Sequence, residues 1–195
     1  MTKQNDIHRF WEWFESNSKD LAVENYPNSK INQLDREIVN FGLSWEIGPG
    51  LIKTNSLTVS ASCNIELLDQ AREFISQAPV ITDWEFYCFK QPKENWSRVK
   101  MLDYGIELTA DAWTYTLFKY EDGKKEILIK SDNLSGIAPE IQIEIIEIVL
   151  TNLLGEERMM NELEYIAVLD QDCDTNKMNK IQNLSEHLKY LKIGA

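Results

Sequence analysis

The sequence predicts an α+β fold, and three observations carry this prediction. Apolar residues recur at helical spacing at the start of the chain, and from residue 43 the spacing changes to the alternation of strands. A hairpin, a helix and a further strand follow one another at 43–90 and again at 112–169. An apolar share of 43% and a charged share of 27% are those of an ordinary globular protein. We therefore expect two ββαβ units with antiparallel sheet, two helices before them and one helix after them.

Two amphipathic helices are expected in the N-terminal segment, residues 1–42. The first can be capped by Asn5 or Asp6, and its apolar stripe is Ile7, Phe10, Trp11 and Phe14. The second begins after Pro27, and its stripe is Ile31, Leu34, Ile38 and Phe41. Gly42 suits the position just after a helix, because glycine readily adopts the left-handed conformation.

The stretch LSWEIGPGL (43–51) contains Gly48–Pro49–Gly50, which is either a phosphate-binding loop or a turn. A phosphate-binding loop leads into a helix, whose N-terminal N–H groups hold the anion. Here the alternation of a strand resumes at 57–61, and no Lys–Ser/Thr pair follows the glycines. Pro49 also removes one backbone donor. The sequence therefore predicts a hairpin turn.

The rest of the first ββαβ unit (43–90) is a helix and a strand. Asn64 can cap the helix and Pro79 ends it. The unbroken apolar run Phe86–Phe89 predicts a strand that is covered on both faces. Residues 91–103 show no apolar period and are expected to form a loop.

The second unit (112–169) repeats this order. Asp122–Gly123 favours a hairpin, Pro139 begins a helix that Gly155 ends, and ELEYIAVL predicts the last strand. Right-handed crossovers lead us to expect strand order 2-1-3 in each unit. The repetition aligns Glu85 with Glu164 and suggests an internal duplication; two unrelated ββαβ units are the alternative.

The whole chain, 1–195, is expected to form a single compact domain. Its last part, 170–195, consists of an acidic loop and a C-terminal helix, with Leu184, Leu188 and Leu191 on one side. These leucines should pack the helix onto the rest of the domain.

Charge and cysteine content narrow the classes of function. The formal net charge of −12 repels nucleic-acid backbones and anionic lipid and attracts basic proteins. The start, MTKQNDIHRF, lacks the pattern of a signal peptide, no apolar run is long enough to span a bilayer, and the three cysteines are far apart. We expect a cytoplasmic protein that binds a protein partner and binds neither nucleic acid nor a membrane. The negative charge of this chain is the reason to consider a basic partner, and the oligomeric state is left open.

Several pieces of the chain resemble a family of uncharacterised bacterial proteins of similar length. The pieces are FWEWF, SWEIG, LTVSAS, QAPVITDWEFYCFKQP, and LLGE followed by ELEYIAVL, and they cover most of the chain. The resemblance implies a small, acid-rich cytosolic α+β protein with no established activity, so it assigns no functional residues. One departure is Ser62–Cys63, which stands where the resemblance implies a glycine-containing turn.

The stretch DQDCDTNK (170–177) alternates acidic residues as a calcium loop does. An EF-hand needs glycine at its sixth position and glutamate at its twelfth, where this chain has Thr175 and Ile181. We expect a solvated acidic loop and no cofactor. The alternative metal ligands are Asp170, Asp172 and Asp174.

Glu85 and Glu164 form the one candidate acid–base pair, since paired carboxylates can share these roles in hydrolases. The alternative is that each carboxylate faces solvent or pairs with a lysine or arginine. His8 and His187 are expected to be lone surface histidines, and we expect no catalytic residue among them.

Trp13 and Trp96 lie outside the apolar periods that predict the core. An exposed tryptophan is a common anchor for a protein partner, and a ring folded back onto its own domain is the alternative. The leading hypothesis is therefore a non-catalytic protein-binding module, within which an immunity- or antitoxin-like role fits the acidity because many toxins are basic. The alternatives are a small hydrolase that uses strand carboxylates and a self-associating structural protein.

Overall fold

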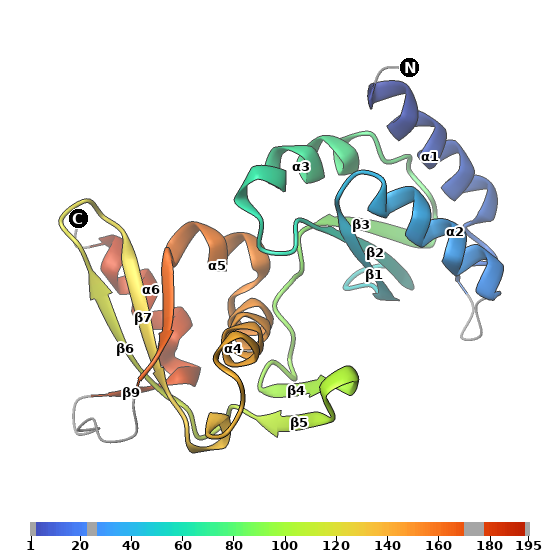
Figure 1. The fold of residues 1–195 in the computed structure, drawn as a ribbon. Coiled ribbons are helices and arrows are strands. Elements are labelled where there is room, and N and C mark those ends of the chain that lie inside the picture. The colour runs from blue at the N-terminus through green and yellow to red at the C-terminus, as the bar shows by residue number, and fades with distance from the viewer. Residues whose placement is uncertain (1–2, 23–26, 170–177, 194–195) are drawn as a thin grey trace. The chain divides into compact units, whose positions relative to one another are not determined.

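The computed structural model of the chain describes residues 3–22, 27–169 and 178–193 (Figure 1). They form two compact units: unit 1 ends at Lys90 and unit 2 begins at Gln91. The described residues contain six α-helices and three small sheets, so the expected α+β class is confirmed. The organisation of the chain as a single domain stays a prediction. None of the described helices has the length and apolar character needed to cross a membrane.

Both N-terminal helices of unit 1 are confirmed. Helix α1 (Lys3–Asn17) buries its predicted stripe, and none of Ile7, Phe10, Trp11 and Phe14 is more than 2% exposed. Helix α2 (Asn28–Val39) buries Leu34 and Ile38. Gly42 follows it with a φ of +72°, the left-handed conformation that glycine adopts without strain.

The sheet of unit 1 has the order β1-β2-β3, formed by Ser44–Pro49, Asn55–Ser60 and Trp84–Cys88. Strand β1 is antiparallel to β2, whereas β3 is parallel to β2. The expected order 2-1-3, with the third strand beside the first, is therefore wrong. After β2, the chain passes through a 3₁₀ turn (Ile65–Leu67) and helix α3 (Leu68–Ser76) and returns to the open edge of β2. A single right-handed crossover fits this direct neighbour as well as the position predicted from the sequence.

The position of β3 at the edge of this sheet has a second consequence. Residues 85–88 are half-buried, so the prediction of a strand covered on both faces is wrong. The central strand is β2, in which all side chains of 56–60 are buried. Aromatic residues in a strand, such as Phe86, fit an edge strand with one covered face as well as a central one.

Helices α1, α2 and α3 lie on one side of this sheet (Figure 1). The Trp11 ring lies 4.9 Å from the Phe86 ring, and the Phe14 ring lies 4.9 Å from the Trp84 ring. The indole N–H of Trp11 donates to the backbone oxygen of Phe74 at 2.8 Å, so this buried polar group is paired. The aromatic side chains of α1 thus form the core of unit 1, as their helical spacing predicts.

In unit 2, two strands lie in the region between the predicted units. Strand β4 (Arg98–Met101) pairs with β5 (Ile106–Thr109) in an antiparallel ladder. The expectation that residues 91–103 form only a loop is therefore wrong. The strand is four residues long and buries only Val99, so its apolar alternation is too short to be recognised in the sequence.

The larger sheet of unit 2 has the order β8-β7-β6-β9, formed by Tyr165–Val168, Lys125–Lys130, Thr114–Lys119 and Asn179–Lys180. The predicted hairpin is the antiparallel pair β6–β7, and β8 is parallel to β7. The order 2-1-3 is thus wrong here for the same reason as in unit 1. Three helices complete the unit: α4 (Pro139–Leu154), α5 (Glu156–Glu162) and α6 (Leu184–Ile193).

The two units share the order hairpin, helix and parallel strand, but their residues correspond differently from the predicted alignment. Glu85 lies opposite Ser56, the second residue of β2, whereas the residue opposite Glu126, the second residue of β7, is Tyr165. The register therefore aligns Glu85 with Tyr165, one residue beyond Glu164. Adjacent residues of a chain in a strand face opposite sides of the sheet, so the predicted alignment of Glu85 with Glu164 is wrong. Descent of the units from a duplication stays a prediction.

Candidate functional site

The loop between β1 and β2, residues 50–54, is a hairpin turn, as predicted. The Gly50 N–H donates to the Thr54 carbonyl oxygen at 3.3 Å. The carboxylate of Glu85, on β3, accepts the backbone N–H groups of Leu51, of Ile52 at 3.2 Å and of Lys53 at 3.4 Å. The loop does hold an anion with successive backbone N–H groups, but that anion is a side chain of the same unit.

Two further contacts fix this loop. The Lys53 ammonium donates to the Ile81 carbonyl oxygen at 2.7 Å, which ties the loop to the segment before β3. A side chain at Gly50 would overlap the Glu85 carboxylate, and its Cβ would lie 2.5 Å from the Lys53 carbonyl oxygen. Gly50 is therefore required by the close approach of the carboxylate to the backbone.

The surroundings of Glu85 act on its pKa in two directions. Partial desolvation raises the pKa, but hydrogen bonds from the Tyr87 hydroxyl and from the backbone of Ile52, Leu51 and Lys53 outweigh it, so the pKa lies below its usual range. The Glu85 carboxylate is therefore charged at neutral pH, which strengthens the hydrogen bonds that hold the loop.

The same loop presents two aliphatic side chains to solvent. Leu51 is 76% exposed and Ile52 is 92% exposed. Such residues are common on surfaces one at a time, but here two adjacent ones lie on a turn whose backbone is fixed by Glu85. The sequence does not single them out, although two aliphatic residues inside a glycine- and proline-containing turn are the available signal.

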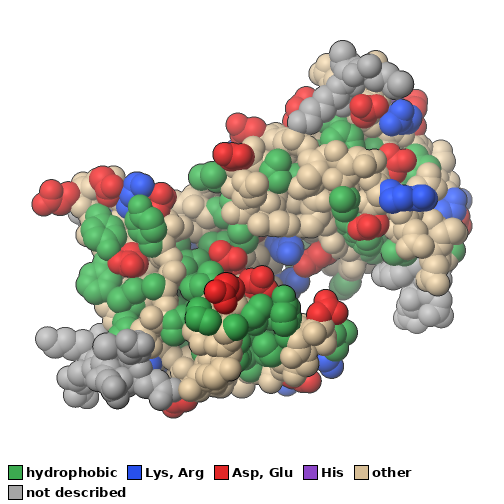
Figure 2. Space-filling view, viewed as in Figure 1, with side chains coloured by type: hydrophobic (Ala, Val, Ile, Leu, Met, Phe, Trp, Pro, Cys, Tyr) green, Lys and Arg blue, Asp and Glu red, His purple; other side chains and the backbone are tan. Residues whose placement is uncertain are grey.

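Hydrophobic side chains also gather on unit 2, over the sheet that contains β6 and β7 (Figure 2). Phe118 is 45% exposed and Tyr165 is 48% exposed. Phe118 lies on β6 and Tyr165 on β8, one on each side of β7. Both are paired with Glu126 of β7 in the ladders, so the three side chains lie in one row across the sheet. The sequence predicts these strands but not that one face of the sheet is open.

The two carboxylates of the predicted acid–base pair each have partners within their own unit. Glu85 holds the 50–54 loop, and Glu164 forms an ion pair with the Lys124 ammonium at 2.9 Å. Glu164 is half-exposed, as its ion pair is on the surface. The catalytic role of Glu85 and Glu164 as an acid and a base stays a prediction.

The two predicted tryptophan anchors are both half-buried. The Trp13 ring lies 6.0 Å from the Phe10 ring at the border of the α1 stripe. Trp96 lies in the segment that leads into β4. Their role as contacts for a partner stays a prediction, and the exposed aliphatic side chains of the 50–54 loop are more accessible to a partner than either ring.

The predicted alternative metal ligands, Asp170, Asp172 and Asp174, lie outside the described residues. Within the described residues, no group of three or more His, Cys, Asp or Glu side chains is placed to hold a metal ion.

The two histidines differ from each other. His8 is an exposed residue of α1 that lies 3.4 Å from Glu12, as expected for a surface histidine. His187 is half-buried, and its Nδ1 lies 2.8 Å from the hydroxyl of the buried Tyr115. The prediction of a lone surface histidine is therefore wrong for His187, because α6 packs on the sheet through this pair.

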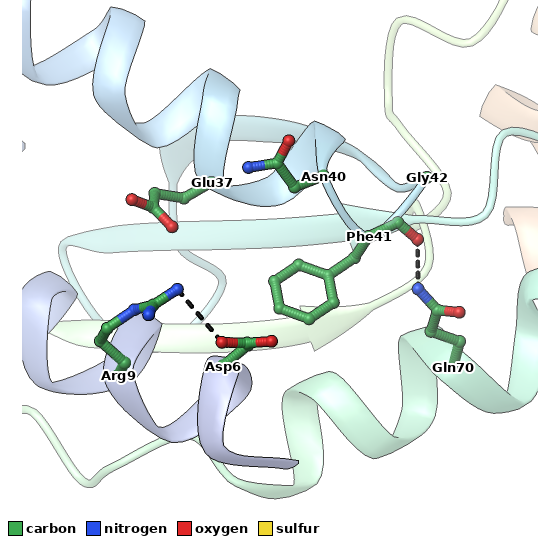
Figure 3. Close-up of a pocket in the computed structure, with 7 residues that line it drawn as sticks. All are labelled: Asp6, Arg9, Glu37, Asn40, Phe41, Gly42 and Gln70. Carbon is green, nitrogen blue, oxygen red and sulfur yellow. Dashed lines mark hydrogen bonds and ion pairs between the residues drawn. The ribbon is translucent and has the colours of Figure 1, made fainter. Parts of the chain in front are cut away.

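A polar groove of about 580 Å³ lies in unit 1 where α1, α3 and the end of α2 meet (Figure 3). The Arg9 guanidinium forms an ion pair with Asp6 at 3.2 Å, and the Gln70 amide donates to the Phe41 carbonyl oxygen. The Arg9 side chain is 61% exposed, so the charges of the groove are solvated.

No protein-family model, no curated protein and no solved structure matches this chain. The resemblance to the uncharacterised bacterial family therefore stays a prediction. The candidate site with the most defined geometry is the loop that Glu85 holds.

Proposed function

We propose that this protein is a non-catalytic protein-binding module whose 50–54 loop docks into a partner. The observation that carries the proposal is that Leu51 and Ile52 are exposed on a backbone fixed by the Glu85 carboxylate. Burying one such side chain in a partner contributes about 1.5–3 kcal/mol. A loop that is ordered before binding also loses little conformational entropy when it docks, which raises affinity.

The chemistry of the partner follows from the shape and charge of this protein. A protruding apolar turn fits a concave apolar pocket, and the net charge of −12 favours a basic surface around that pocket. Complementary charge accelerates association and makes it sensitive to salt. An immunity- or antitoxin-like role, in which an acidic protein neutralises a basic one, fits this description.

The hydrolase alternative has less support. A general acid near neutral pH needs a carboxyl group whose pKa is raised. The pKa of Glu85 is lowered, and its oxygens accept backbone hydrogen bonds. Glu85 is therefore better suited to hold the loop than to donate a proton.

The proposal is tested by placing a photo-crosslinking amino acid at position 52 or, as a control, at position 65, in cells that naturally produce the protein. Ile65 is an exposed isoleucine of the same unit, at the other end of β2. We expect one protein to be crosslinked from position 52 and not from position 65. The crosslinked protein is then purified and titrated with the unmodified chain.

Substitutions then measure the contribution of the loop to this complex. Ile52→Ser with Leu51→Ser should weaken binding at least about a hundredfold, whereas Ile65→Ser should leave it unchanged. Raising the salt concentration should slow association if the partner is basic. The absence of any specific crosslink from position 52, or equal binding by the loop variants and the control, would contradict the proposal.

A further inference from the structure

We propose that two copies of this chain associate face to face through the open side of the larger sheet in unit 2. This side, called the outer face below, is defined by side chains that share one side of four strands. They are Thr114, Thr116 and Phe118 of β6, Glu126, Leu128 and Lys130 of β7, Tyr165 and Ala167 of β8, and Lys180 of β9.

The opposite side of the sheet is the one that the unit covers itself. Tyr115, Ile127 and Ile129 alternate with the residues of the outer face, and all three are 0% exposed. The Tyr115 hydroxyl lies 2.8 Å from His187, so α6 lies on this covered side, behind the strands in Figure 1. Every side chain of the outer face is at least partly exposed.

The outer face has an apolar centre. Phe118 and Tyr165 lie on either side of Glu126, and Thr116, Leu128 and Ala167 form the next row. An antiparallel hairpin with one solvent-facing side normally carries polar residues there. Glu126 is the acidic residue between Phe118 and Tyr165, and its carboxylate accepts a hydrogen bond from the Tyr120 hydroxyl. Covering such a surface with a second apolar layer lowers the free energy.

The second layer is inferred to be another copy because the charges of the outer face complement themselves. Glu126 lies at one end of β7, and Lys130 lies four residues further on, about 13 Å away along the strand. Leu128 is midway between them. A two-fold axis that runs across the strands at Leu128 therefore places Glu126 of each copy over Lys130 of the other copy.

A two-fold axis that runs along β7 would instead place Glu126 over Glu126, which is disfavoured by repulsion. Two chains that each carry a net charge of −12 also repel each other, so they can approach only where the charges locally balance. Lys180 lies beside Thr114, at the same end of the sheet as Lys130. At the other end, Lys124 and Glu164 neutralise each other at 2.9 Å.

The association should be of modest strength. The outer face is three strands wide apart from the two residues of β9, which is smaller than the roughly 800 Å² that each partner buries in a standard interface. We expect a dissociation constant of about 10–100 µM, well above that of an obligate dimer. Two stacked sheets lie about 10 Å apart, and the proposed axis places Leu128 of each copy over Leu128 of the other and Phe118 over Thr114.

Sedimentation equilibrium of the full chain, from about 5 µM to about 1 mM, tests the inference. The average mass should rise with concentration from 22.7 kDa towards twice that value. Phe118→Lys should weaken association by about tenfold or more, whereas Tyr190→Lys should not change it. Tyr190 is a matched control because it is 71% exposed but lies on α6.

A charge exchange tests the proposed axis independently of the aromatic residues. Glu126→Lys and Lys130→Glu should each weaken association about three- to tenfold, and the double variant should restore it. These two substitutions lie on the surface, so they report on association even if Phe118→Lys impairs folding. A constant mass of 22.7 kDa up to about 1 mM would overturn the inference. So would association that Phe118→Lys leaves unchanged, or a double variant as weak as the single ones.

Discussion

Glu85 and Ile52 are 33 positions apart in the chain, yet the carboxylate of the first accepts the backbone N–H of the second at 3.2 Å. The contact exists because β3 lies beside β2, which brings the start of β3 next to the loop that precedes β2. The orientation of Leu51 and Ile52 in solvent therefore depends on a residue of another strand.

The first prediction concerns pH. The pKa of Glu85 is lowered in the folded protein, so the carboxylate stabilises the loop fully above its usual value of 4.5. This stabilisation is lost as the pH falls through the lowered pKa. NMR amide proton shifts of Leu51, Ile52 and Lys53 should titrate together below pH 4.5 and should not titrate in Glu85→Gln. A common midpoint above 4.5 would contradict the prediction.

The second prediction compares two glycines. Gly50→Ala should destabilise unit 1 by about 1–3 kcal/mol, because the new Cβ would overlap the Glu85 carboxylate and approach the Lys53 carbonyl. Gly48→Ala should be neutral or stabilise by up to about 1 kcal/mol, because no atom lies within 4 Å of its Cβ position. Urea unfolding measures both. Equal effects of the two substitutions would show that the loop does not require Gly50.

The third prediction concerns Tyr115. Burial raises the pKa of Tyr115 to about 12, from its usual 10.0. The folded protein therefore retains this proton where the unfolded chain loses it, so stability is full below pH 10 and falls between pH 10 and about 12. Tyr115→Phe should remove this loss. Thermal melting temperatures across this range measure it, and an equal decline in both proteins would contradict the assignment.

The fourth prediction compares two ion pairs of unit 2. Arg158 and Glu162 lie 2.8 Å apart with Glu162 4% exposed, whereas Lys124 and Glu164 lie 2.9 Å apart with Glu164 46% exposed. Glu162→Ala should cost about 3 kcal/mol because it leaves a partly buried guanidinium without this partner. Glu164→Ala should cost less than about 1 kcal/mol. Both are read from urea unfolding of the same unit, and a larger loss for Glu164→Ala would reverse the assignment.

Local patterns in the sequence predict much of this fold. The stripe of α1 is buried where its 3.6-residue period places it, and Gly42 has the left-handed conformation expected after a helix. Asn64 accepts the Glu66 N–H at 3.0 Å, as expected for a cap. These features depend on residues within a few positions of one another, which is why the sequence reveals them.

Features that depend on distant pairing could not be predicted in this way. The strand order depends on whether the crossover through α3 places β3 beside β1 or beside β2. The spacing of apolar residues in β3 does not distinguish these two positions. The role of Glu85 depends on that order and therefore could not be predicted either. Ser62 and Cys63 have φ values of +51° and +60°, in the left-handed region that favours glycine, and neither residue type reveals this conformation in the sequence.

The backbone N–H groups of the 50–54 loop form a carboxylate-binding site that the Glu85 side chain fills. Removing the side chain with Glu85→Ala would leave the N–H groups of Leu51, Ile52 and Lys53 directed at a vacant position. Formate or acetate supplied in the buffer is expected to fill this position in the variant and so to restore the turn by chemical rescue. The ordering of residues 50–54 could then be adjusted by the concentration of a simple anion.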